Sequence, residues 1–325
     1  MTDIYLNFPA FRLGGQRRTL AETEAANGLF SAAGALGDAG FGTHHVCPDD
    51  ESAYDLARGA LDDMLTSYPE TRDLLPRIDL ILYVTCLPLN GNHGDVSQFE
   101  SSRDVKHLMD FPASRLQADF GMENAYVMGI NQQACTGMLG SIRVAASMLR
   151  AEPDLQHILC ITADRFPKGA AYEQAYNLIS DGGAACIVSR EARGYRFLGA
   201  HHITNGAMAT ANDEETAGFY FSYSHRMITE LCNKAGITTA DVRWIVPQNT
   251  NRKAWRILSS VLRFDFQRIL MPTIGTAGHC ISGDNIINLK TVQSEGQIQP
   301  GDKILLPMAG FGLNWSCILL EKVAD

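Results

Sequence analysis

One cysteine, Cys135, lies where an apolar strand is expected to pass through a tight turn into a helix. A buried strand is predicted from Val127 onward, and after the cysteine Leu139, Ile142 and Ala146 recur at helical spacing. Unpaired N–H groups and the dipole at a helix start favour a thiolate. The pattern therefore predicts a nucleophile, with a small apolar core cysteine as the alternative interpretation.

A histidine and an aspartate five residues apart, His279 and Asp284, offer a base for that thiol. A helix is predicted at 285–294, directly after the aspartate. A carboxylate at this position can cap the helix and accept a hydrogen bond from the imidazole, which fixes the tautomer. Cys135, His279 and Asp284 then form the nucleophile–base–orienter series of acyl transfer. The alternatives are an ordinary N-cap and a histidine that is only a satisfied polar group.

Composition narrows the class of protein. The chain has 325 residues, of which 46% are hydrophobic, and a net charge of −9 that argues against nucleic-acid binding. No apolar run approaches the roughly 18 residues of a membrane span, and the N-terminus lacks the pattern of a signal peptide. Eight scattered cysteines predict a reduced, cytoplasmic protein. His44, His45 and Cys47 have no fourth ligand at suitable spacing, so no metal site is expected.

The chain shows the pattern of two similar halves. Near-continuous apolar strands alternate with helical patterns, which predicts an α/β protein with mainly parallel, layered sheets. The polar stretch 189–194 divides residues 1–191 from residues 192–325. The matching strands are 77–85 with 241–248, 157–163 with 303–309, and 181–189 with 312–320, and the matching helices are 54–65 with 223–235.

Five short motifs, in order, carry a resemblance to a known family. The chain resembles the thiolase superfamily, and most of all ketoacyl-acyl-carrier-protein synthase III, from about Tyr54 onward. The motifs are Gln133-Ala-Cys-Thr-Gly137, Ser180-Asp-Gly-Gly-Ala184, Ile245-Val-Pro-Gln-Asn-Thr-Asn251, Gly296-Gln-Ile-Gln-Pro-Gly301 and Gly310-Phe-Gly-Leu-Asn-Trp315.

This resemblance implies a fold and several roles. The fold would be a thiolase-like α/β fold, with two pseudo-repeated halves in α-β-α-β-α layers, in a homodimer. Cys135 would accept the acyl group, and the backbone N–H groups of Cys135 and Gly312 would hold the oxyanion. Phe111 would reach across the dimer and limit the acyl size, with a core aromatic as the alternative.

Two positions depart from the condensing members of the family. Gln248 replaces a histidine, and Gly278-His-Cys-Ile281 replaces a loop that carries an asparagine. Glutamine can donate a hydrogen bond but cannot exchange a proton. The His-x4-Asp arrangement resembles a branch from natural-product pathways that transfers acyl groups without forming a carbon–carbon bond.

An acyl donor requires a docking surface. Arg252, Lys253 and Arg256 open a predicted helix and offer a basic face to an acyl carrier protein or to coenzyme A phosphates, with a solvated helix face as the alternative. Asn251 precedes this helix and is expected to be an auxiliary pocket residue, as is Gln248. No permanently bound cofactor is expected, because acyl-CoA or acyl-phosphopantetheine is the substrate.

The sequence therefore predicts an acyltransferase that passes an acyl group from Cys135 to a hydroxyl, amine or thiol. Two alternatives stay open. In a decarboxylating synthase III, Gln248 and His279 would jointly donate to the malonyl oxygen. The second alternative is a non-catalytic partner subunit of a heterodimeric synthase. Such subunits often lose the nucleophile, and the intact Cys135 argues against this alternative. The long polar segment 87–110 is expected to be an insertion that forms a lid or a partner surface, with partial disorder as the alternative.

Overall fold

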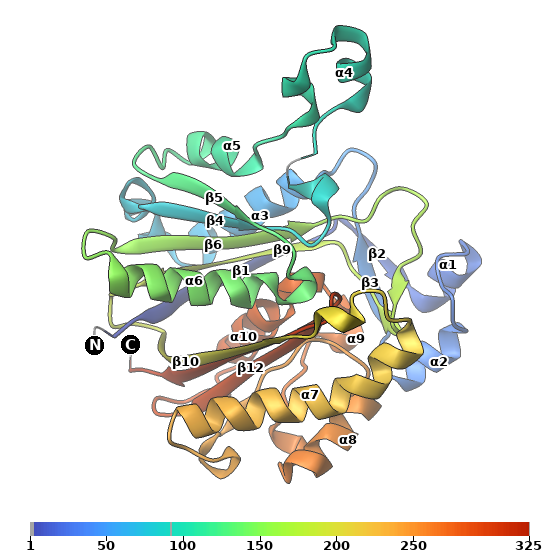
Figure 1. Cartoon of the computed structure of the whole chain (residues 1–325), viewed down its shortest axis with the longest axis vertical. Helices are drawn as coiled ribbons and strands as arrows, with labels where there is room; N and C mark the ends of the chain where they lie inside the picture. Colours follow the sequence, from blue (N-terminus) through green and yellow to red (C-terminus); the bar gives the residue numbers. More distant parts are fainter. Residues whose placement is uncertain (1–2, 92, 325) are drawn as a thin grey trace.

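A nine-stranded sheet runs through the whole molecule (Figure 1). The computed structural model describes residues 3–91 and 93–324. In spatial order the strands are β11 (Trp244–Ile245), β12 (Lys303–Gly310), β13 (Asn314–Lys322), β10 (Tyr195–Thr204), β1 (Tyr5–Leu13), β9 (Gly182–Ser189), β6 (His157–Asp164), β4 (Leu80–Val84) and β5 (Tyr126–Ile130). Two small hairpins add β2 (Gln16–Thr19) with β3 (Thr43–Val46), and β7 (Glu173–Gln174) with β8 (Asn177–Leu178).

Helices of several lengths connect these strands. The α-helices are α1 (Leu20–Ala25), α2 (Ala33–Asp38), α3 (Ala53–Ser67), α4 (Val96–Ser102), α5 (Pro112–Asp119), α6 (Gly137–Ala151), α7 (Asp213–Lys234), α8 (Arg252–Leu262), α9 (Ile274–Ala277) and α10 (Asp284–Ser294). Short 3₁₀ helices are η1 (Pro69–Asp73), η2 (Leu75–Arg77), η3 (Pro88–Asn90), η4 (Val105–Leu108), η5 (Ala134–Thr136), η6 (Gly206–Met208), η7 (Thr239–Asp241), η8 (Phe266–Arg268) and η9 (Ile281–Gly283).

The elements form five layers, and three separate clusters of buried side chains lie between them. α3 and α5 pack on the outer face of the first half of the sheet, and α7 and α8 cover the second half (Figure 1). α6 and α10 lie between the halves, where Ile142 and Ile286 belong to one central cluster. Each outer helix layer has its own cluster. The thiolase-like α-β-α-β-α architecture is thereby confirmed.

The sheet is mixed in direction. Strands joined through helices pair in parallel, as the alternation of strands and helices predicted: β4 with β5, β4 with β6, and β11 with β12. The other pairs are antiparallel, since β9 and β13 return beside β6 and β12, and β1 enters between β9 and β10. The two halves meet through β1 and β10, which pair only at Tyr5 and Leu6.

The repeated helices are present with different bounds. The helix expected at 54–65 is α3, while the helix expected at 223–235 is the last part of α7, which begins ten residues earlier at Asp213. A capping box in which Asn212 and Glu215 exchange hydrogen bonds starts α7. The proposed boundary between residues 191 and 192 falls in the turn between β9 and β10.

The strand before Cys135 is not buried, contrary to the sequence prediction. β5 is an edge strand, and Tyr126 and Met128 on it are 44% and 42% exposed. Its apolar residues indicated a core strand because periodicity alone does not tell which strand is the last in a sheet. An apolar edge strand that lacks a neighbour is a template for pairing with another chain.

The segment 87–110 projects from the molecule near α5 and carries α4 and η4 (Figure 1). Several of its apolar side chains are exposed, among them Val105 and Met109. In the part of the chain that the structure describes, no helix is long and apolar enough to cross a membrane. Residues 3–91 and 93–324 also contain no group of three or more His, Cys, Asp or Glu side chains that could hold a metal ion.

Candidate active site

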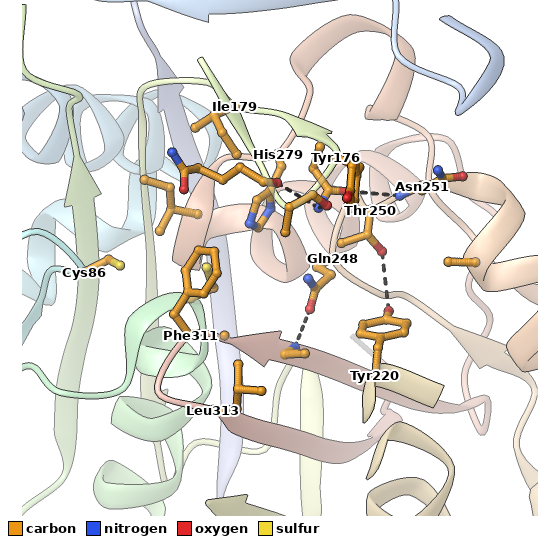
Figure 2. A pocket seen from close by; sticks show the side chains of 18 of the residues that line it. Cys86, Tyr176, Ile179, Tyr220, Gln248, Thr250, Asn251, His279, Phe311 and Leu313 are labelled. Atoms are coloured by element: carbon orange, nitrogen blue, oxygen red, sulfur yellow. Dashed lines mark hydrogen bonds between the residues drawn. The ribbon is translucent and has the colours of Figure 1, made fainter. Parts of the chain in front are cut away.

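A cavity of about 440 Å³ lies where the two halves of the chain meet. It brings together Cys135, Gln248, Asn251 and His279, four of the residues predicted from the sequence (Figure 2). Most of the remaining wall is apolar, with aromatic rings from several elements. These rings belong to Phe166, Tyr176, Tyr220, Phe221, Phe311 and Trp315.

The turn before α6 fixes the position of Cys135. Gln132 and Ala134 have positive φ angles of 64° and 44°, a conformation that costs about 1–3 kcal/mol for a residue other than glycine. Cys135 follows in η5, directly ahead of α6. Gly310 of β12 comes so close that a Cβ atom there would lie 2.8 Å from the Cys135 backbone nitrogen. The glycine at position 310 is therefore required for β12 to contact the nucleophile turn.

The surroundings of Cys135 disfavour its thiolate form. A hydrogen bond with the Cys86 thiol and burial raise its pKa well above the ordinary value, and the negative charges of Asp284 and Asp164 raise it further. These effects oppose the thiolate that the start of a helix favours. A thiol in this state needs a base to become a nucleophile.

His279 supplies that base from the second half of the chain. Its backbone N–H donates to the Leu178 carbonyl at 2.8 Å, and its carbonyl accepts from the Ser180 N–H at 2.9 Å. Its ring nitrogen Nδ1 lies 2.5 Å from Oδ2 of Asp284. An ionised carboxylate can only accept, so Nδ1 carries the proton and Nε2 is the basic nitrogen.

Asp284 is fully buried and accepts three hydrogen bonds. Besides His279, the backbone N–H groups of Asn249 and Cys280 each donate to it at 2.7 Å. The predicted helix cap is wrong in one respect: Asp284 is the first residue of α10, Gly283 is the N-cap, and no side chain caps the helix. The carboxylate accepts from the loops before the helix instead.

Gln248 and its neighbour Asn249 have different roles. The Gln248 amide oxygen accepts from the Ala309 backbone N–H, and its amide nitrogen faces the same side as His279 (Figure 2). Asn249 was missed from the sequence. Its side chain donates to the Gly278 carbonyl at 2.7 Å and to the Thr273 hydroxyl at 2.8 Å, so it holds the loop that leads into His279.

A signal for this buried polar network was present in the sequence. Asn285 and Asn288 stand three residues apart in the apolar helix α10, which places them on one face. Asn288 donates to the Asn249 side-chain oxygen at 2.9 Å, and both residues are fully buried. Buried amides require partners, so such a pair indicates polar groups packed against the helix.

The other predicted site residues are placed as follows. Gly312 has a φ of +111° and lies in the turn between β12 and β13, between Phe311 and Leu313 of the cavity wall. Asn251 caps α8 by accepting from the Lys253 N–H at 2.8 Å. Phe111 is 58% exposed and is not part of the cavity wall in this chain.

The basic residues lie on the solvent side of α8. Arg252, Lys253 and Arg256 are exposed, and Arg256 stacks over the Phe266 ring at 4.6 Å. Trp255 points inward, is buried, and donates to the Thr250 hydroxyl at 2.9 Å. α8 therefore presents a basic outer face immediately after Asn251 of the cavity wall.

Comparisons with known proteins agree with this fold. Residues 130–206 match the family model described as 3-Oxoacyl-[acyl-carrier-protein (ACP)] synthase III. Residues 232–322 match the model for the C-terminal part of the same family. The two models together cover more than half of the chain, including both segments that carry Cys135 and His279. The chain belongs to the synthase III-like group of the thiolase superfamily.

Relatives and solved structures are distant in sequence and similar in fold. The beta-ketoacyl-[acyl-carrier-protein] synthase III of Rhizobium johnstonii is 24% identical over 310 residues, which are 87% of this chain and 88% of the relative. The synthase III structure from Aquifex aeolicus has a TM-score of 0.79 at 18% identity and covers 98% of this chain and 99% of that one.

Two further structural neighbours have other names. ChlB3, described as an acyltransferase, has a TM-score of 0.82 at 17% identity and covers 99% of this chain and 98% of that one. OleA of Xanthomonas campestris has a TM-score of 0.79 at 16% identity, with 98% of each chain covered. The protein is therefore a synthase III-like enzyme with the thiolase fold.

Proposed function

We propose that this protein is an acyltransferase that loads an acyl group onto Cys135 and passes it to a hydroxyl, amine or thiol acceptor. The observation that carries the proposal is the buried Asp284–His279 pair, with Nδ1 and Oδ2 2.5 Å apart, on the cavity that Cys135 also lines. A nucleophile, a base and a group that orients the base are the parts that acyl transfer requires.

Loading begins with proton removal from Cys135. Because the pKa of this thiol is raised, His279 Nε2 must take the proton as the sulfur attacks the thioester carbonyl. The imidazolium that forms is stabilised by Asp284. The oxyanion would be held by the backbone N–H groups of Cys135 and Gly312, and the thiol of coenzyme A or of the carrier leaves with the proton.

Transfer repeats this chemistry with the acceptor. His279 Nε2 removes the acceptor's proton while its oxygen, nitrogen or sulfur attacks the acyl carbonyl. The tetrahedral intermediate collapses, and the Cys135 sulfur leaves and regains a proton from the imidazolium. Asp284 keeps the ring in the tautomer that both steps need, since it accepts only from Nδ1–H.

Gln248 supports transfer over condensation. The resemblance implies that condensing members hold the malonyl thioester oxygen with a histidine and an asparagine. Here the Gln248 amide oxygen already accepts from Ala309, so the group can offer only its amide N–H. Among the described residues of the cavity wall, His279 is the one histidine, and its Nδ1 is occupied by Asp284. A decarboxylative condensation is the alternative that the test below addresses.

The donor would be an acyl-CoA or an acyl carrier protein. The exposed basic residues Arg252, Lys253 and Arg256 follow the cavity residue Asn251 on α8. Negatively charged carriers and coenzyme A phosphates are attracted to such a face. The relatives are named for an acyl carrier protein, which agrees with this choice. A natural-product or fatty-acid-related pathway would supply the acyl group.

A homodimer would account for the exposed edge strand. β5 presents Tyr126 and Met128 to solvent, and Phe111 at the start of α5 is exposed beside it. Pairing of β5 with its copy would extend the sheet and cover these side chains. Phe111 would then approach the acyl pocket of the partner, as the family resemblance implies.

The test separates transfer from condensation. Intact-protein mass spectrometry with a panel of acyl-CoA donors first identifies the group that loads onto the wild type but not onto Cys135→Ala. The loaded enzyme then receives carboxyl-labelled malonyl thioester in one reaction and hydroxyl, amine and thiol acceptors in another. We expect an ester, amide or thioester product and retained carboxyl label. Labelled carbon dioxide together with a β-keto product would show a condensing enzyme instead.

A further inference from the structure

A second cysteine stands beside the nucleophile in the cavity. Cys86 follows the end of β4, is half-buried, and lines the same cavity as Cys135. Figure 2 shows its side chain directed toward the cavity from the first half of the chain. No motif in the sequence connects Cys86 with Cys135, which lies 49 positions further along the chain.

Backbone packing brings the two thiols together. A Cβ atom at Gly137 would lie 2.5 Å from Cγ1 of Val84, so the end of β4 is pressed against the start of α6. Each contact residue stands two positions from one of the cysteines. The Cys86 and Cys135 side chains line the same cavity, and Cys86 is the largest of the influences that raise the pKa of the Cys135 thiol.

A buried carboxylate holds Cys86 in this place. Asp164 accepts the Cys86 and Leu87 backbone N–H groups at 3.0 Å and the Thr85 hydroxyl at 2.7 Å. The Asn90 amide donates to the same carboxylate at 3.2 Å. Four donors from one short loop fix its backbone, so the Cys86 thiol is presented to Cys135 rather than to solvent.

We propose that Cys86 is a resolving cysteine, which forms a reversible disulfide with Cys135 when a peroxide enters the cavity. The Cys135 proton passes to His279 and the thiolate sulfur attacks one peroxide oxygen. The O–O bond breaks, and water leaves with that proton. The sulfenic acid on Cys135 then condenses with the Cys86 thiol and releases a second water. One peroxide is reduced and two thiols are oxidised, and an external dithiol reverses the reaction.

The disulfide would have two consequences. It takes the nucleophile out of acyl transfer while peroxide is present. It also stops the oxidation of Cys135 at a level that thiols can reverse, before sulfinic and sulfonic acids form. The enzyme would thus lose activity and regain it without new synthesis.

The protein contains its own comparison pair. Cys160 and Cys186 face each other across β6 and β9 and are fully buried in the central core. Neither residue lines the cavity that His279 lines. If proximity alone decided the reaction, peroxide would oxidise the Cys160–Cys186 pair as readily as the Cys86–Cys135 pair. The proposal requires that the Cys86–Cys135 pair is oxidised first.

The experiment exposes the purified, reduced protein to hydrogen peroxide, blocks free thiols with iodoacetamide, and maps peptides without reduction. We expect a crosslinked peptide that joins Cys86 to Cys135. Cys160 and Cys186 should remain free thiols that iodoacetamide alkylates after mild unfolding. Dithiothreitol should restore the Cys135 thiol. In Cys86→Ser, peroxide should carry Cys135 to sulfinic acid, and dithiothreitol should not restore it. Cys232→Ser, which removes a thiol that does not line the cavity, should behave as the wild type.

Three results would overturn the proposal. The first is a wild-type protein in which Cys135 is a sulfinic acid and Cys86 is still a free thiol. The second is a Cys86→Ser variant in which dithiothreitol restores Cys135 as fully as in the wild type. The third is that neither cysteine is oxidised. The wild-type peptide map decides the matter even if Cys86→Ser folds poorly. The readout is the state of the thiols, so it does not depend on which acyl-transfer reaction the enzyme performs.

Discussion

Replacement of Asp284 by asparagine tests the orienting role most directly. The side chain keeps its shape, but one acceptor oxygen becomes an NH₂ donor. Oδ2 now accepts from His279 and from the Asn249 N–H, and Oδ1 accepts from the Cys280 N–H. An NH₂ group in place of Oδ2 would face two donors. In place of Oδ1 it would face one donor.

The magnitude follows from these contacts. Each lost hydrogen bond to a buried charged group costs about 1.5–3 kcal/mol. Because at least one such bond is lost, the free energy of unfolding should fall by at least about this amount. If the NH₂ group meets Nδ1 of His279, the ring must carry its proton on Nε2 and ceases to be a base. A wrong tautomer of this kind lowers kcat by up to about 10⁴-fold. If the ring keeps its tautomer, we expect transfer to slow by less than the roughly 10²–10⁴-fold typical for removal of the base itself.

The assay measures the two half-reactions separately. Single-turnover mass spectrometry follows acyl loading onto Cys135 from a strongly activated thioester and then its loss to the acceptor. His279→Ala sets the limit for complete loss of the base. It should leave loading partly intact and slow transfer, and Asp284→Asn should cost less than this unless the tautomer is inverted.

A matched control is present in the same fold. Asp181 is another buried carboxylate that accepts three hydrogen bonds, from the Cys47 and Phe166 backbone N–H groups and the Tyr172 hydroxyl. Asp181→Asn should reduce stability without changing the His279 tautomer. If the two variants slow transfer equally at a temperature where both are folded, Asp284 does not orient the base and the reasoning is wrong.

Further predictions concern the nucleophile, the donor and alkaline pH. Cys135→Ala should take no covalent acyl label, and peptide mapping that finds the label on another cysteine would contradict the assignment. Charge reversal at Arg252, Lys253 and Arg256 should raise the apparent KM for a carrier-bound donor roughly tenfold, since each exposed charge pair contributes about 0.2–1 kcal/mol. The kcat should change little. If charge reversal raised the KM for a minimal pantetheine donor by the same factor, these three residues would not be a docking surface for the carrier. Burial raises the pKa of Cys232 to about 11, so its contribution to stability is present below about 8.5, the ordinary cysteine value, and is lost as pH rises. Calorimetry in a reducing buffer should show a Tm that falls above this pH, less so in Cys232→Ala.

Local patterns in the sequence predicted the parts of the site that depend on neighbours along the chain. Cys135 before a helix and the His279–Asp284 spacing are both short-range features, and the structure places them on one cavity. The layered α/β class followed from the alternation of strands and helices, and the five-layer arrangement followed from the family resemblance. These predictions required no knowledge of which distant segments touch.

Features that depend on distant contacts could not be predicted. The raised pKa of Cys135 comes from Cys86 and from burial between two halves of the chain. The role of Asn249 depends on where the Gly278 carbonyl and α10 lie. The exposure of β5 depends on its being last in the sheet order, and a run of apolar residues carries no information about that order.

The short bridge between Ile179 and His279 has a mechanical consequence. The base belongs to the second half of the chain, yet its backbone is fastened on both sides to Leu178 and Ser180 of the first. The same half carries Cys135, so the base and the nucleophile share one support. From the second half, Asn249 and Asp284 hold the loop that carries His279. The base is thus anchored to both halves of the chain at once.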